Sequence, residues 1–126
     1  MSVESKNIIL DKSFVFALHV IELYKKLIKQ NEFVLSRQLL RSATSIGANI
    51  EEALGGHSKK DFLAKMIISY KEARETKYWL RLIDKSNIIR EDIEPYLKEI
   101  DEINNILTAI INTSKKNLEP SPILNS

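Results

Sequence analysis

Seven residues between positions 62 and 83 follow one another at alternating intervals of four and three: Phe62, Met66, Ser69, Ala73, Thr76, Leu80 and Ile83. An α-helix turns through about 100° per residue, so this spacing places all seven in one seam along one face. The register holds for three heptads, as is typical of a helix packed lengthwise against other helices. We therefore predict a long helix from Ser58, its N-cap, to about Lys85.

The segment before it carries two helical patterns at once. One is apolar and consists of Leu39, Ala43, Ile46, Ile50 and Ala53. The other, which we call the polar stripe, lies more than a quarter turn away and consists of Gln38, Arg41, Ser45, Asn49 and Glu52. Both predict a helix over about residues 32–54, with Asn31 as N-cap and Gly55-Gly56 as its end.

Gly47 lies inside this second helix, where glycine is about 1 kcal/mol less favourable than alanine. A helix that keeps a glycine there is expected to have a neighbour too close for a side chain. Small residues also fill the middle of the 58–85 seam, around Ala73. We predict that these two helices approach each other most closely at Gly47 and Ala73.

Residues 13–29 predict a first helix, with Asp11 or Ser13 as N-cap, and they contain two adjacent apolar seams. The first seam, expected to face the core, is Phe14, Ala17, Ile21, Tyr24 and Ile28. The second seam is Phe16, Val20, Leu23 and Leu27. The combined apolar arc is wider than one helix pair covers, so the second seam is either additional core or a contact between subunits.

Residues 91–114 predict the last helix, with Pro95 in its first turn. Its seam is Ile93, Tyr96, Ile100, Ile103, Leu107 and Ile110. Four long amphipathic helices with short connections predict an all-α, antiparallel up-down-up-down four-helix bundle in one domain. We expect an N-terminal lead at 1–12, the bundle at 13–114 and a disordered tail at 115–126.

Several function classes find no support in the residues. The chain has no Cys, and neither of its two His is part of the Glu-x-x-His pairs that bundle di-iron sites need. A phosphate-binding Gly loop and a Gly-x-Ser-x-Gly elbow are absent from the sequence. We expect a protein that is not an enzyme and uses no metal or cofactor. With no secretory signal or membrane-spanning segment recognised, we expect it in the cytoplasm and not in a membrane.

The polar stripe has three interpretations: a network between neighbouring subunits, a set of contacts that orient helices within one bundle, or a ligand or RNA site. Arg41 and Glu52 lie about 16 Å apart along a straight helix. They cannot pair with each other and must find partners elsewhere. We favour a structural or interface role over direct ligand contact.

A basic ridge follows one side of the 58–85 helix, with Tyr70 and Tyr78 between its cations. The cations are Lys60, Lys71, Arg74, Lys77, Arg81 and Lys85. Cations beside aromatic rings suit phosphate contact and base stacking. The alternative, which we favour for a lone subunit, is a solvated helix face with long side-chain stems packed along the bundle. Repetition in a ring of subunits would strengthen the field considerably.

The spacing Gln38-Leu39-x-Arg41-Ser42-x-x-Ser45-Ile46-x-x-Asn49-Ile50-x-Glu52-Ala53, with Ser58-x-x-Asp61-Phe62 after the double glycine, resembles a known family. These are the four-helix-bundle proteins encoded in intervening sequences of bacterial 23S rRNA genes. The resemblance covers roughly residues 13–112, although Ala53-Leu54 stands where the family often has Glu-Gly. It implies a left-handed antiparallel bundle and a homo-oligomer, commonly a pentamer. A related accessory protein of diversity-generating retroelements works with a reverse transcriptase and RNA.

The sequence thus leads to two main hypotheses. The first is a non-enzymatic, oligomeric RNA-binding or ribonucleoprotein accessory scaffold, with RNA or a nucleic-acid enzyme as partner. Lys71, Arg74, Arg81 and Lys85 would bind phosphates and Tyr78 would stack on a base. The second is a protein-interaction adaptor with no nucleic-acid role. A bundle that binds a small molecule is a third alternative.

Overall fold

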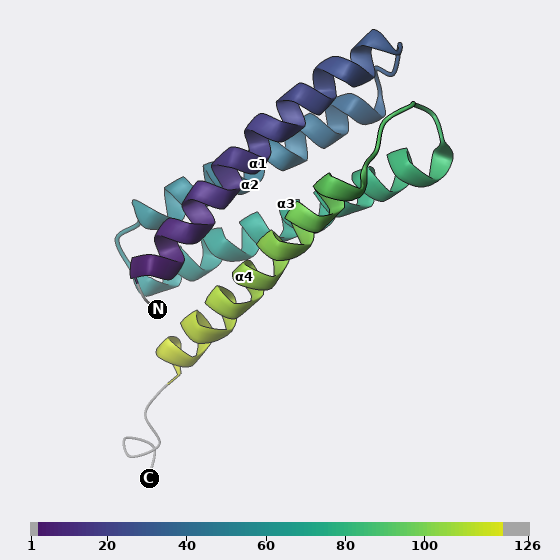
Figure 1. Ribbon diagram of the computed structural model, residues 1–126. Helices are drawn as coiled ribbons and strands as arrows, with labels where there is room; N and C mark the ends of the chain where they lie inside the picture. Colours follow the sequence, from purple (N-terminus) through teal and green to yellow (C-terminus); the bar gives the residue numbers. More distant parts are fainter. Residues whose placement is uncertain (1–2, 120–126) are drawn as a thin grey trace.

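A computed structural model describes residues 3–119, and this part of the chain contains four α-helices and no strand. Their bounds are α1 Val3–Lys29, α2 Leu35–Leu54, α3 Lys59–Ser86 and α4 Glu94–Leu118. Each helix packs against two neighbours, in the order α1, α2, α3, α4 and back to α1. α1 begins and α4 ends at the same end of the molecule (Figure 1). The fold is therefore the predicted antiparallel up-down-up-down four-helix bundle.

The seams predicted for α3 and α4 form the core. In α3 every seam residue after Phe62 is buried, and in α4 every seam residue except Tyr96 is buried. Phe62 and Tyr96 are half-buried at the two ends of the bundle. Burying one large aliphatic side chain stabilises a fold by about 1.5–3 kcal/mol, so these continuous seams supply most of the force that holds the helices together.

The prediction for α1 was wrong in two respects. The helix begins at Val3 rather than near Ser13, so most of the expected lead is helical. The expected core seam also lies at the edge of the core, since Phe14 is 65% exposed and its other four residues are half-buried, whereas every residue of the second seam is fully buried. The reason is that Ile9 and Ser13 extend the second seam upstream in steps of four and three, and both are buried. The second seam is thus core, not spare surface.

Polar side chains hold α2 and α3 close together at the small middles of their seams. The Ser69 hydroxyl donates to the main-chain carbonyl of Ile46 at 2.9 Å. The Thr76 hydroxyl lies 2.9 Å from the Ser42 hydroxyl. A side chain of α3 can reach the α2 backbone only where the two helices nearly touch, so the predicted close approach of these helices is confirmed.

Gly47, however, does not serve this contact. A Cβ at Gly47 would lie 3.3 Å from the Ser13 hydroxyl oxygen of α1. The prediction that Gly47 faces α3 was therefore wrong, and the glycine instead admits α1. α2 thus has small residues on two sides: Ser42, whose hydroxyl contacts Thr76 of α3, and Gly47, which lies against Ser13 of α1.

The start of α2 is fixed by Glu32 rather than by the predicted cap, Asn31. The Glu32 carboxylate accepts hydrogen bonds from the backbone N–H groups of Val34, Leu35 and Ser36, at 3.1, 2.8 and 2.6 Å. These donors belong to the first turn, where a helix leaves N–H groups without partners. Asn31 adopts the left-handed conformation, with φ 64°, and forms the preceding turn.

The remaining helix ends fall within a few residues of their predicted positions. Ser58 caps α3 as predicted, accepting from the N–H of Asp61 at 3.0 Å. α4 begins at Glu94 rather than Glu91, with Pro95 in its first turn, and continues to Leu118. The first residues of the predicted tail are therefore helical, and positions 120–126 lie outside the described residues.

Three pairs of oppositely chargeable side chains join the outer edge of α1 to α4 and to the loop before it. They are Lys12–Glu102 at 2.8 Å, His19–Glu99 at 2.8 Å and Lys26–Glu91 at 3.7 Å. Exposed pairs of this kind contribute about 0–1 kcal/mol each. They fix the register of α4 against α1 more than they stabilise the fold.

Candidate nucleic-acid interface

The basic ridge lies on the outer face of α3, on the side that faces α4. The six residues predicted for nucleic-acid binding are all exposed: Lys60, Lys71, Arg74, Tyr78, Arg81 and Lys85. At 1.5 Å per residue, the ridge extends about 37 Å from its first cation to its last. Because these positions lie opposite the buried seam, none of the six side chains is needed to fill the core.

Two shallow hollows lie between α3 and α4, with volumes of about 780 and 350 Å³. Tyr70 and Arg74 line both, so the hollows adjoin and form what we call the α3–α4 groove. Lys71, Arg74, Tyr78 and Arg81 line this groove. Of the six predicted residues, these four are brought together, and Lys60 and Lys85 continue the ridge beyond the groove on either side.

The other wall of the groove comes from α4 and is rich in amides. Its polar side chains are Asp101, Asn104, Asn105, Thr108, Asn112 and Lys115. Sequence analysis missed this wall because it contains few cations. The spacing of positions 104, 108 and 112 in steps of four was a signal, since it marks a polar stripe on one helix face.

The groove contains cations without carboxylate partners. Lys77 pairs with the Asp101 carboxylate at 2.7 Å. Among the residues that the structure describes, Lys71, Arg74 and Arg81 have no carboxylate within 4 Å. The Arg74 guanidinium lies 5.9 Å from the centre of the Tyr70 ring. Cations that keep their charge unneutralised next to aromatic rings are available to a phosphate chain.

Asn104 adds an unusual feature to the floor of the groove. Its side-chain carbonyl oxygen is buried and accepts no hydrogen bond from the described residues. An acceptor left in this state costs about 1–3 kcal/mol. Because that oxygen is enclosed by protein, a ligand in the groove would reach the exposed amides of Asn105 and Asn112 instead.

The polar stripe of α2 lies at the outer edge of the α2–α3 contact. Arg41 pairs with Glu72 at 3.2 Å and also with Glu75, whereas Glu52 pairs with Lys65 at 2.8 Å. The prediction that Arg41 and Glu52 need partners outside their own helix is confirmed. These contacts favour a role in orienting two helices of one bundle.

The other members of the stripe make local contacts. The Ser45 hydroxyl donates to the Arg41 carbonyl at 2.7 Å, and the Asn49 amide donates to the Ser45 carbonyl at 2.8 Å. Gln38 is exposed. A role of the stripe between subunits, or toward a ligand, stays a prediction.

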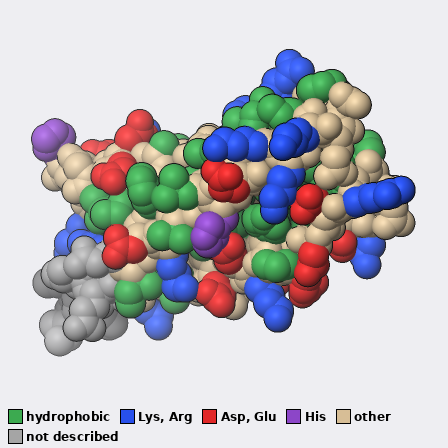
Figure 2. Space-filling model, turned by 45° about the horizontal axis from the view of Figure 1, so that its top comes forward, with side chains coloured by type: hydrophobic (Ala, Val, Ile, Leu, Met, Phe, Trp, Pro, Cys, Tyr) green, Lys and Arg blue, Asp and Glu red, His purple; other side chains and the backbone are tan. Residues whose placement is uncertain are grey.

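A second surface feature is a group of exposed apolar side chains on α1. Ile8, Phe14, Val15 and Leu18 are 47%, 65%, 45% and 48% exposed. Figure 2 shows hydrophobic side chains reaching the surface between charged ones on one face of the molecule. Their helical positions lie away from the buried seam, and the other residues within 3–119 leave them exposed.

Within residues 3–119, no three metal-ligating side chains come together, and no helix is long and apolar enough to cross a membrane. His19 lies on the exposed α1–α4 edge against Glu99.

The fold places the chain in the class of small all-α four-helix bundles. The chain belongs to the 23S rRNA-intervening sequence protein family, whose model matches residues 5–109. It is also similar to a protein of unknown function from the S23 ribosomal protein family of Bacteroides thetaiotaomicron, known from a crystal structure. The identity is 47%, the match covers 86% of this chain and 98% of the other, and the TM-score is 0.82. A search of curated proteins found no match.

Proposed function

We propose that this protein is a cytoplasmic, non-enzymatic RNA-binding scaffold that holds a single-stranded stretch of a structured RNA in the α3–α4 groove. The observation that carries the proposal is the set of three cations, Lys71, Arg74 and Arg81, exposed beside Tyr70 and Tyr78 without carboxylate partners among the described residues. The family name adds genetic support for a role with RNA, because it says that such proteins are encoded in intervening sequences of 23S rRNA genes.

The groove offers separate contacts for the backbone and the bases of an RNA strand. Arg74 and Arg81 would contact phosphates, and Lys60 and Lys85 would extend that contact along α3. The Tyr78 side chain is 54% exposed and presents a ring for stacking. The exposed amides of Asn105 and Asn112 would form hydrogen bonds with base edges. Backbone contacts supply affinity, and the base contacts would favour unpaired RNA over duplex.

We further propose that the scaffold is a homo-oligomer, with a pentamer favoured by the family resemblance. The support is the exposed apolar group on α1, which a second copy would cover. Several copies in a ring would bring several grooves to one RNA. Linked sites bind far more tightly than single ones because the second contact is intramolecular.

The experiment measures binding of a structured RNA with single-stranded loops, such as a 23S rRNA fragment, in a filter assay over a salt series. Arg74→Ala/Arg81→Ala should weaken binding about tenfold or more and lower the salt slope by about 1.4, from 0.7 per phosphate contact on a single strand. The matched control is Arg90→Ala/Lys98→Ala, which removes two exposed charges outside the groove.

Equal losses in the two double variants would mean that net charge, not the groove, binds RNA. Absence of RNA binding by the wild type, even at low salt, would refute the proposal and favour the second candidate, a protein-interaction adaptor. That candidate is supported by Phe33 and Val34 at the start of α2, which are 50% and 69% exposed and leave a second apolar surface for a partner protein.

A further inference from the structure

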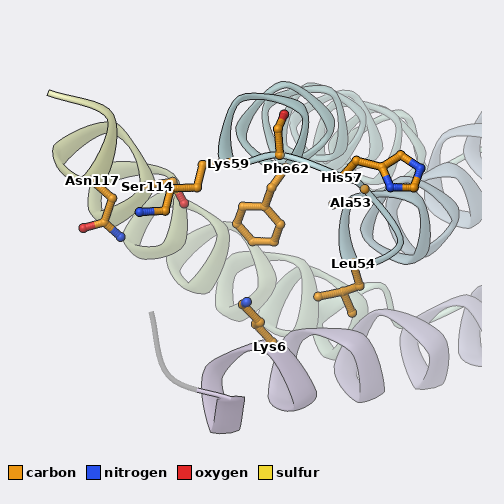
Figure 3. A pocket seen from close by; sticks show the side chains of 10 residues that line it. Lys6, Ala53, Leu54, His57, Lys59, Phe62, Ser114 and Asn117 are labelled. Atoms are coloured by element: carbon orange, nitrogen blue, oxygen red, sulfur yellow. The ribbon is translucent and has the colours of Figure 1, made fainter.

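A pocket of about 370 Å³ opens where all four helices come together at one end of the bundle. α1 contributes Lys6, α2 contributes Leu54, α3 contributes Lys59 and Phe62, and α4 contributes Ser114. Figure 3 shows the Phe62 ring in the middle of this group, with Lys6 pointing toward it from α1. The pocket and the α3–α4 groove share no lining residue.

The pocket combines an apolar floor with positive charge. The ring of Phe62 is half-buried, and Ala53 and Leu54 form an apolar wall beside it. The Lys6 ammonium lies 5.2 Å from the centre of the Phe62 ring. The Lys59 side chain extends toward Ser114 and Asn117 (Figure 3). The two ammonium groups thus come from different helices, one against the Phe62 ring and the other on the α4 side of the pocket (Figure 3).

This charge is not neutralised by the described residues. No Asp or Glu is among the lining side chains, and neither Lys6 nor Lys59 forms an ion pair within the part of the chain that the structure describes. Ser114, which is 7% exposed, and Asn117 bring a hydroxyl and an amide from α4. A site with unneutralised cations, hydrogen-bonding groups and an aromatic floor favours an anion that carries a ring.

We propose that this pocket binds a small organic anion, with a planar ring against Phe62 and a carboxylate or phosphate between Lys6 and Lys59. Its volume lies near the lower end of the 300–1,000 Å³ usual for ligand pockets, which suits an aromatic acid or a mononucleotide. The binding of this anion does not depend on the RNA-binding role, because the two sites use different residues.

The test is an amide NMR titration of the full chain with adenosine 5′-monophosphate, which has both a ring and a phosphate. Saturable shifts should appear around Lys6, Lys59 and Phe62. Adenosine, which lacks the anion, and inorganic phosphate, which lacks the ring, should each bind at least about tenfold more weakly. A parallel titration with benzoate distinguishes a site for carboxylates from one for phosphates.

Two variants connect binding to the proposed contacts. Lys6→Ala/Lys59→Ala and Phe62→Leu should each weaken binding of the better anion about tenfold or more, with the helical circular dichroism unchanged. Lys29→Ala/Lys98→Ala, which removes two charges far from the pocket, should have no effect. Arg74→Ala/Arg81→Ala should also keep the anion affinity, so a failure here is distinguishable from a failure of RNA binding.

Three results would overturn the proposal. The first is the absence of saturable shifts with either anion up to about 10 mM. The second is equally tight binding of adenosine or inorganic phosphate, which would mean that ring and charge are not recognised together. The third is an unchanged affinity in the Lys6→Ala/Lys59→Ala variant, which would leave the two lysines as solvated helix ends.

Discussion

The contact between Gly47 and Ser13 allows a quantitative test of how α1 and α2 pack. Replacing Gly47 with alanine should improve helix propensity by about 0.8–1.0 kcal/mol. The new methyl group would lie 3.3 Å from the Ser13 hydroxyl oxygen, however, and the next Ser13 side-chain atom, Cβ, is at an ordinary 3.7 Å. Only the hydroxyl must therefore move.

Moving that hydroxyl breaks its hydrogen bond to the Leu10 carbonyl, which is 3.0 Å long. Such a bond contributes about 0.5–1.5 kcal/mol. The gain and the loss nearly cancel, so Gly47→Ala alone should change the free energy of unfolding by less than about 0.5 kcal/mol. In a Ser13→Ala background, where no hydroxyl obstructs the methyl group, the same change should stabilise by about 1 kcal/mol.

The assay is urea unfolding of the four proteins in this double-mutant cycle, followed by helical circular dichroism. We expect a coupling energy of about 0.5–1 kcal/mol between the two positions, since residues in contact are not additive. Additive effects would show that Ser13 and Gly47 do not touch. A stabilisation of 1 kcal/mol by Gly47→Ala in the wild-type background would lead to the same conclusion.

Three further predictions concern the α2 cap, the apolar surface and one phenol. Glu32→Ala should lower the free energy of unfolding in urea by about 1–2 kcal/mol, because it removes the acceptor of three N–H groups. An unchanged urea midpoint of unfolding would show that water replaces the carboxylate as acceptor. Phe14→Ser should alter stability by less than about 0.5 kcal/mol but lower the mass in light scattering, and an unchanged oligomer would exclude that residue from the contact. Burial raises the pKa of Tyr96 above its ordinary 10.0, so its phenolate absorbance should appear only above pH 10. The free energy of unfolding should fall in the same pH range, because the tyrosine ionises at a lower pH in the unfolded chain than in the folded one. Titration of Tyr96 at pH 10 or below would contradict this.

How far the sequence predicts this fold depends on whether each helix has one apolar register or several. The α3 seam has one apolar register, so its burial and its small middle were predicted correctly. α1 has two registers of equal quality within residues 13–29, and the choice is made by Ile9, which lies upstream of that window, together with Ser13 at its first position. Gly47 correctly predicted a close neighbour, but a single helix does not show which neighbour it faces.

The candidate site shows the same limit. The basic residues of α3 are visible in the sequence because they share one helix side. The amide wall of α4 joins them through the rotation of α4 against α3, which depends on how the Ile103 and Leu107 side chains pack into the core. The partners of Arg41 were likewise invisible, since Glu72 and Glu75 lie on another helix.

NMR mapping with a short single-stranded RNA tests whether the α3–α4 groove is the RNA-binding site of this protein. We predict that amide shifts concentrate between Tyr70 and Arg81 of α3 and between Asn104 and Asn112 of α4, and that they weaken as salt is raised. Shifts concentrated on α1 around Phe14, or no shifts at low salt, would contradict the account.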